Sequence, residues 1–200
     1  MSDDHSSGGP QPSPTPQPGE LFTLAPVGPT EGTDLEIDLA VDHPDWTEIT
    51  DLEALVHRSI AAALTGAGLG DAAGTIAVCL SDDARVRDVN RAWRGQDKPT
   101  NVLSFPSDDP RLPRLTGAPP PHIGDLILAF ETTDREARRD GKSLVAHLTH
   151  LLVHGTLHLV GFDHEVDAEA EVMEGLERHV LASLGIADPY HEDAVLEAAQ

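Results

Sequence analysis

Residues 143–164 read SLVAHLTHLLVHGTLHLVGFDH, and this stretch decides both the fold around it and the candidate site. Ser143 is a good helix N-cap, and the apolar residues that follow it predict a long helix to about Val160. Five of the chain's eleven histidines lie in this stretch. That density indicates a chemical role rather than packing alone.

Three of these histidines, His154, His158 and His164, have the spacing of a metal site. Helical residues four apart are separated by about 6 Å along the axis, so His154 and His158 can bind one ion. Gly161 permits a left-handed turn that ends the helix and brings His164 to the same ion. Three neutral imidazoles leave the fourth position of a tetrahedral zinc open, as in catalytic sites. We therefore predict one zinc ion per chain.

The polar neighbours of these histidines allow more than one interpretation. His147 and His150 lie near the same helical face, and we expect them to be packing residues or to orient the metal ligands. Asp163 can orient a ligand or cap backbone amides. Some metalloproteases share the histidine spacing, but they need a glutamate base directly after the first histidine, where this chain has Gly155. A metalloprotease is therefore the weaker alternative.

The remaining sequence predicts one domain at residues 34–190, preceded by a tail that is rich in proline, glycine, serine and threonine. That tail, residues 1–33, is predicted to be disordered, and residues 191–200 form a C-terminal tail. Strands and helices are mixed without strict alternation. We predict strands at residues 35–41, 75–80, 101–105 and 124–130, the last one central in its sheet. We predict helices at residues 46–64, from a Ser81 cap to Gly95, from Thr132 or Thr133 to about 140, at 143–160 and at about 168–184.

The net charge of −22 argues against nonspecific binding of nucleic acid through bulk electrostatics. Residues 85–142 nevertheless hold eleven lysines and arginines against nine acids, which allows a local cationic patch or a set of solvated helix-surface charges. The single cysteine, Cys79, lies in an apolar run and is expected to be buried. No stretch predicts a membrane span or an export signal, so we expect a cytoplasmic protein that binds neither membrane nor DNA.

Three segments resemble the YbeY family of endoribonucleases and rRNA maturation factors. Residues 154–164, HGTLHLVGFDH, resemble the family signature H-G-x-L-H-L-x-G-Y/F-D-H. Residues 93–106, WRGQDKPTNVLSFP, and residues 123–127, IGDLI, are similar to two further family segments. The resemblance covers about residues 35–190. Its departures are substitutions by similar side chains, at Trp93, Ile123 and Phe162.

The resemblance implies that residues 34–190 are a metal-dependent hydrolase domain with an α+β fold. In that fold a small mixed β-sheet packs against helices, and a zincin-like helix and turn hold the histidines in a cleft. The implied activity is that of a zinc-dependent, single-strand-specific endoribonuclease in small-subunit rRNA 3′-end maturation and ribosome quality control. The expected partners are single-stranded RNA, small-subunit rRNA, and the small ribosomal subunit or its assembly proteins.

The resemblance also implies catalytic residues, namely Arg94 together with His154, His158 and His164. A guanidinium at position 94 can hold a phosphate with two parallel hydrogen bonds, although a cation is also favoured there simply as the end of a helix. Polar groups at strand ends are expected to line the cleft or to cap turns: Asn101, Ser104 and Asp125.

Two questions stay open at the level of sequence. No general base is evident beside the histidines, so attack by water and attack by the RNA 2′-hydroxyl are both compatible with the sequence. The acidic composition also favours an alternative of another class. In this alternative the chain is a non-enzymatic ribosome-assembly factor whose zinc is structural and whose acidic surface binds a protein partner.

Overall fold

The computed structural model describes residues 35–107, 121–164 and 166–190. The two tails predicted at residues 1–33 and 191–200 lie outside the described residues. None of the helices within the described ranges is long and apolar enough to cross a membrane.

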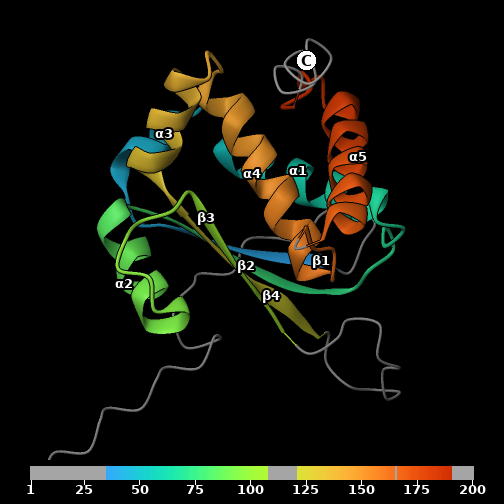
Figure 1. Cartoon of the computed structure of the whole chain (residues 1–200), viewed down its shortest axis with the longest axis horizontal. Coiled ribbons are helices and arrows are strands. Elements are labelled where there is room, and N and C mark those ends of the chain that lie inside the picture. Colours follow the sequence, from blue (N-terminus) through green and yellow to red (C-terminus); the bar gives the residue numbers. More distant parts are fainter. Residues whose placement is uncertain (1–34, 108–120, 165, 191–200) are drawn as a thin grey trace, which may run out of the picture.

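Four strands form one mixed sheet in the order β1-β2-β4-β3 (Figure 1). Their bounds are β1 Leu35–Val41, β2 Gly74–Ser81, β3 Val102–Pro106 and β4 His122–Ala129. Strands β1 and β4 both pair with β2 in parallel, and β3 pairs antiparallel with β4. The predicted strands and the small mixed sheet are confirmed, and β4 lies inside the sheet as expected of its apolar sequence.

Helices cover both faces of this sheet. Their bounds are η2 Pro44–Glu48 (a 3₁₀ helix), α1 Leu52–Gly66, α2 Asp83–Arg94, α3 Phe130–Arg139, α4 Leu144–Leu159 and α5 Asp167–Ser183. Helices α1 and α4 pack on one face, and α2 packs on the other. Helix α5 contacts α4 and α1 on their outer side, so α4 lies between the sheet and α5 (Figure 1). This arrangement confirms the predicted α+β fold.

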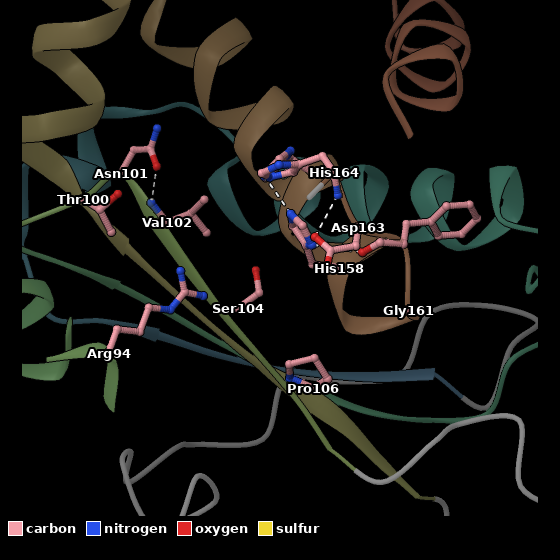
Figure 2. Close-up of a pocket in the computed structure, with 12 residues that line it drawn as sticks. Arg94, Thr100, Asn101, Val102, Ser104, Pro106, His158, Gly161, Asp163 and His164 are labelled. Carbon is pink, nitrogen blue, oxygen red and sulfur yellow. Dashed lines mark hydrogen bonds between the residues drawn. The ribbon is translucent and has the colours of Figure 1, made fainter. Parts of the chain in front are cut away.

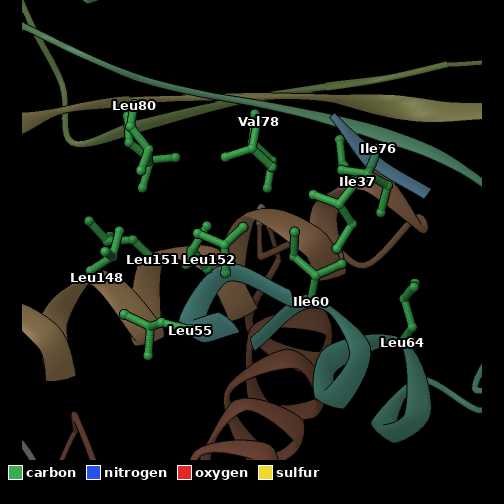
Figure 3. Packing of buried hydrophobic residues seen from close by; sticks show 14 of the residues in the cluster. Ile37, Leu55, Ile60, Leu64, Ile76, Val78, Leu80, Leu148, Leu151 and Leu152 are labelled. Carbon is green, nitrogen blue, oxygen red and sulfur yellow. The ribbon is translucent and has the colours of Figure 1, made fainter. Parts of the chain in front are cut away.

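The two faces of the sheet separate because successive side chains of a strand point in opposite directions. Leu80 of β2 packs with Leu148 and Leu152 of α4, and Figure 3 shows these side chains facing one another. The preceding residue, Cys79, packs with Val86 of α2 on the opposite face. Cys79 is 0% exposed, so the predicted buried thiol is confirmed.

The predicted helix at residues 46–64 is wrong as a single element. The chain forms a short 3₁₀ helix, becomes extended at Ile49 and starts α1 only after Asp51, whose φ is 53°. Trp46 accounts for the break. Its ring is fully buried and its Nε1 donates to the Ser81 carbonyl at 3.0 Å, so this turn is anchored to the end of β2 while α1 packs farther along the sheet.

Two predicted helix caps are also wrong. Ser81 ends β2, and the cap of α2 is Asp82, which accepts from the Arg85 amide at 2.7 Å. Helix α3 begins at Phe130, so Thr132 lies inside the first turn rather than before it. The Thr132 amide instead donates to the Asp83 carboxylate of α2 at 3.0 Å. A carboxylate from another helix thus supplies the cap, which a local sequence pattern does not reveal.

Helix α4 begins as predicted, because the Ser143 hydroxyl accepts from the Ala146 amide at 3.1 Å. The helix packs tightly against the sheet at Gly155. A Cβ atom at this position would lie 2.8 Å from Cδ2 of Leu126 on β4 and 3.2 Å from Oγ of Ser104 on β3. Only glycine therefore lets α4 lie this close to β3, and the contact places the neighbouring residue His154 beside that strand.

Substitution of Gly155 by glutamate should destabilise the metal-free protein by more than about 3 kcal/mol, because the side chain meets a packed sheet and buries a charge. Gly175→Glu is the matched control. It changes the charge and the helix propensity equally, but a Cβ atom at position 175 meets nothing within 4 Å. This control should stay within about 1 kcal/mol of wild type. Urea denaturation measures both variants, and equal stability of the two would contradict the close contact.

Candidate metal centre

A cleft of about 750 Å³ lies between the C-terminal end of α4, the loop that follows it, and strand β3. His154, His158 and His164 line one side of it. Figure 2 shows Arg94 and Ser104 across the cleft from His158 and His164. The cleft therefore brings together all four residues that the sequence proposed as catalytic.

The three histidines converge as their spacing predicted. His154 and His158 lie one turn apart on α4, and Gly161, with a φ of 93°, turns the chain so that His164 returns toward them. One ring nitrogen from each histidine lies within 4.8 Å of the others, an arrangement that could hold a metal ion. The Nε2 atoms of His154 and His158 are 3.1 Å apart. Binding of a metal by these residues stays a prediction.

The hydrogen bonds of these rings determine which nitrogen carries the proton. His154 Nδ1 lies 2.7 Å from Oε1 of Glu177, and His158 Nδ1 lies 3.0 Å from the Phe162 carbonyl oxygen. A carbonyl or carboxylate oxygen only accepts, so both rings donate from Nδ1. Each neutral ring then has its lone pair on Nε2, and the two lone pairs face each other.

Two lone pairs at this separation repel each other unless a cation lies between them. Zinc binds imidazole nitrogen at about 2.0–2.1 Å, and tetrahedral angles then place two such nitrogens about 3.3 Å apart. The 3.1 Å between the Nε2 atoms of His154 and His158 is close to that value. The donor set and its hydrogen bonds thus fit a zinc ion.

Burial also keeps His158 in the neutral form that can bind a cation. Burial, together with the nearby His154 and His164, lowers the pKa of His158 from its ordinary 6.5 to about 4. His158 is therefore neutral at physiological pH and its lone pair is available. Burial alone would raise the pKa of Glu177, but hydrogen bonds from His150, His154 and Tyr190 outweigh it and hold that pKa well below its usual range.

Glu177 and Tyr190 were not identified from the sequence. The Glu177 carboxylate, on α5, accepts from His150 Nε2 at 3.0 Å and from the Tyr190 hydroxyl as well as from His154. One signal could have revealed Glu177. It lies four residues from Met173 and from Leu181, on the apolar stripe of α5 that packs against α4.

The predicted polar lining of the cleft is partly correct. Asn101 and Ser104 line it, but Asp125 does not, so the cleft-lining alternative is wrong for Asp125. Asp125 is 1% exposed within β4, and its carboxylate pairs instead with His122 Nε2 at 3.1 Å. His147 makes no hydrogen bond to His154, His158 or His164. Its Nε2 atom instead lies 3.0 Å from Oε2 of Glu136 on α3.

Asp163 was expected either to orient a ligand or to cap backbone amides, and the structure shows the contact with a backbone amide. Its Oδ1 atom accepts from the backbone amide of His164 at 2.7 Å, which fixes the turn that presents this histidine. Asp163 also lines the cleft (Figure 2).

Arg94 differs from the other arginines near it. Arg87 donates to Asp97 at 2.7 Å, and Arg91 donates to Asp88 at 2.9 Å. Arg94 makes no hydrogen bond or ion pair with another residue of the part of the chain that the structure describes. The pairing of Arg87 and Arg91 with acids favours solvated surface charges over a broad cationic patch. Because Arg94 has no such partner among the described residues, its guanidinium is available to a ligand in the cleft.

Comparison with known proteins is consistent with the sequence motifs. The family model described as Endoribonuclease YbeY matches residues 40–185. An Endoribonuclease YbeY of Nitrobacter winogradskyi is 52% identical over 150 residues, which are 72% of this chain and 76% of that protein. One from Chelativorans sp. is 50% identical over 154 residues, 77% of this chain and 92% of that protein. A solution structure of TM1509 from Thermotoga maritima matches 76% of this chain and 97% of its own chain, with 22% identity and a TM-score of 0.47.

The free energy of unfolding of the metal-free protein should fall as the pH is lowered from about 6.5 to 4. In this window His158, with its folded pKa of about 4, stays neutral in the folded chain but is protonated in the unfolded chain. Protons therefore favour unfolding. Denaturation in the presence of a chelator at about pH 7 and pH 5 measures the effect.

His158→Asn should reduce the difference between the two pH values. His179→Asn, at an exposed histidine of α5, is the control and should leave the difference as in wild type. An unchanged pH dependence in His158→Asn would show that burial of a neutral His158 does not carry the effect.

Proposed function

The chain belongs to the endoribonuclease YbeY family, and on that premise we propose that it is a zinc-dependent endoribonuclease that cleaves single-stranded RNA. Its proposed substrate is small-subunit rRNA, in 3′-end maturation and ribosome quality control. The proposed partners are the small ribosomal subunit or its assembly proteins, in the cytoplasm. The observation that supports the proposal best is the cleft in which Arg94 lies across from His158 and His164 (Figure 2).

Cleavage of a phosphodiester builds negative charge on the phosphoryl oxygens, and a nuclease site must stabilise that charge. The Arg94 guanidinium is suited to this task because it is planar, permanently charged and able to donate two parallel hydrogen bonds to two oxygens. It makes no ion pair within the described residues that a phosphate would have to displace. Zinc bound by the three histidines would add Lewis acidity toward a phosphoryl oxygen or a water molecule.

The surface charge suggests how RNA reaches the cleft. The net charge is −22, and the arginines of α2 and α3 with a charged partner include Arg87, Arg91, Arg138 and Arg139. Long-range attraction to a polyanion is therefore weak. We infer that RNA is held by short-range contacts in the cleft after a ribosomal partner has brought the chain to it.

The metalloprotease alternative loses support at Gly155. This position would have to carry the glutamate base, yet a Cβ atom there already meets Leu126 at 2.8 Å. The assembly-factor alternative is separated from the enzyme by activity. Zinc alone does not distinguish the two, because a structural ion would be bound by the same histidines.

The decisive comparison is between Arg94→Ala and Arg91→Ala. Arg94→Ala should keep its zinc and its melting temperature but lose about 10–100-fold in kcat/KM on single-stranded RNA, the cost of a charged hydrogen bond to the phosphate. Arg91→Ala removes the same charge one turn earlier on α2 and should stay within about threefold of wild type. His158→Ala should lose both zinc and cleavage. Elemental analysis and a cleavage assay measure these properties.

Other outcomes of these assays would favour one of the alternative functions. Wild-type protein that contains zinc but does not cleave RNA would favour the assembly factor, and cleavage of denatured casein would favour the protease. Full activity in Arg94→Ala would remove Arg94 from the mechanism. Product ends distinguish the two routes of attack, because a cyclic 2′,3′-phosphate requires attack by the RNA 2′-hydroxyl.

A further inference from the structure

A carboxylate lies behind the histidine cluster, on the side away from the cleft. Glu177 of α5 is 0% exposed and lies on the buried side of this helix with Met173, Val180 and Leu181 of an apolar cluster. Burial of an ionised carboxylate is strongly unfavourable unless hydrogen-bond donors surround it. Its presence at this position therefore requires compensation by specific partners.

Three donors supply that compensation. His154 Nδ1 donates to one carboxylate oxygen of Glu177 at 2.7 Å. His150 Nε2, at 3.0 Å, and the Tyr190 hydroxyl donate to the other oxygen. Tyr190 is held in turn by Arg178, whose guanidinium carbon lies 5.2 Å from the centre of the tyrosine ring. The carboxylate is thus fixed from α4, from α5 and from the segment after α5.

Only one of these hydrogen bonds leads to the candidate metal site. Because Glu177 accepts a hydrogen bond from Nδ1–H of His154, the lone pair of that ring must lie on Nε2, which is 3.1 Å from Nε2 of His158. A negatively charged partner at Nδ1 also raises the basicity of Nε2, which makes this nitrogen a stronger ligand for a metal ion. The Phe162 carbonyl has the same geometric role for His158, but it is neutral.

We propose that Glu177 is a positioning residue of the metal centre, which fixes the orientation and tautomer of His154 and strengthens its bond to the ion. This inference rests on the proposed zinc site of the preceding subsection. Helix α5, which lies outside the cleft, then contributes to metal affinity through a single buried side chain. His150 and Tyr190 keep the carboxylate in place and have no contact with the ion.

A second metal ion is the competing explanation for the same residues. Nitrogen and oxygen atoms of His150, His154 and Glu177 also lie within 4.8 Å of one another. A cation there would have to displace the protons that both rings donate to Glu177, and His154 would have to bind two ions at once. The three donors on the carboxylate, which occupy both of its oxygens, favour the positioning role.

The test compares zinc affinity in wild type, Glu177→Gln and Glu171→Gln, by competition with a chromophoric chelator at neutral pH. Glu171→Gln is the matched control, because it removes the same charge from an exposed position of the same helix. Glu177→Gln should bind one zinc ion about 10–100-fold more weakly than wild type. Loss of the carboxylate partner of a metal-binding histidine typically has an effect of this size. Glu171→Gln should match wild type within about twofold.

A second measurement does not depend on the folding of the variant. Nitrogen-15 spectra of zinc-loaded wild-type protein should show a proton on Nδ1 of His154 and the metal on Nε2. Zinc on Nδ1 of His154 would overturn the inference, and so would equal zinc affinity in wild type and folded Glu177→Gln. Two ions in wild type and one in Glu177→Gln would establish the second metal site instead. Absence of zinc binding in wild type would contradict the proposed function as well.

Discussion

The contact between helix α4 and the sheet at Gly155 is the constraint on which the rest of the site depends. Because position 155 has no side chain, α4 lies against Leu126 of β4 and Ser104 of β3. His154 and His158 then stand at the rim of a cleft whose other wall is β3. The opposite side of α4 is covered by α5, which brings Glu177 behind His154. The site therefore forms where the sheet, α4 and α5 meet.

The chemistry of the site follows from the placement of protons and charges. Glu177 and the Phe162 carbonyl accept hydrogen bonds from Nδ1 of His154 and His158, so the lone pairs of both rings lie on Nε2 atoms that are 3.1 Å apart. Such preorganisation lowers the cost of binding a cation, because the ligands need not reorient. On the other wall, Arg94 presents a guanidinium that does not pair with any described acid. In this strongly acidic chain, Arg94 thus offers a cationic group to a phosphate in the cleft.

Sequence reasoning succeeded where the determining interactions are local. The Ser143 cap, the turn at Gly161 and the convergence of His154, His158 and His164 all depend on residues that lie close together in the sequence. It failed where a distant residue decides the local structure. The start of α3 depends on Asp83 of another helix, and the break before α1 depends on the anchoring of Trp46 to the end of β2. The ion pairs between arginines and acids, such as that of Arg87 with Asp97, were also not evident from the sequence.

Anomalous X-ray scattering at the zinc edge, from crystals of the zinc-loaded protein, tests the central claim most directly. The account predicts one strong peak per chain in the cleft, about 2.1 Å from the Nε2 atoms of His154 and His158 and from a ring nitrogen of His164. A peak between His150, His154 and Glu177, or no peak beside the three histidines, would contradict it.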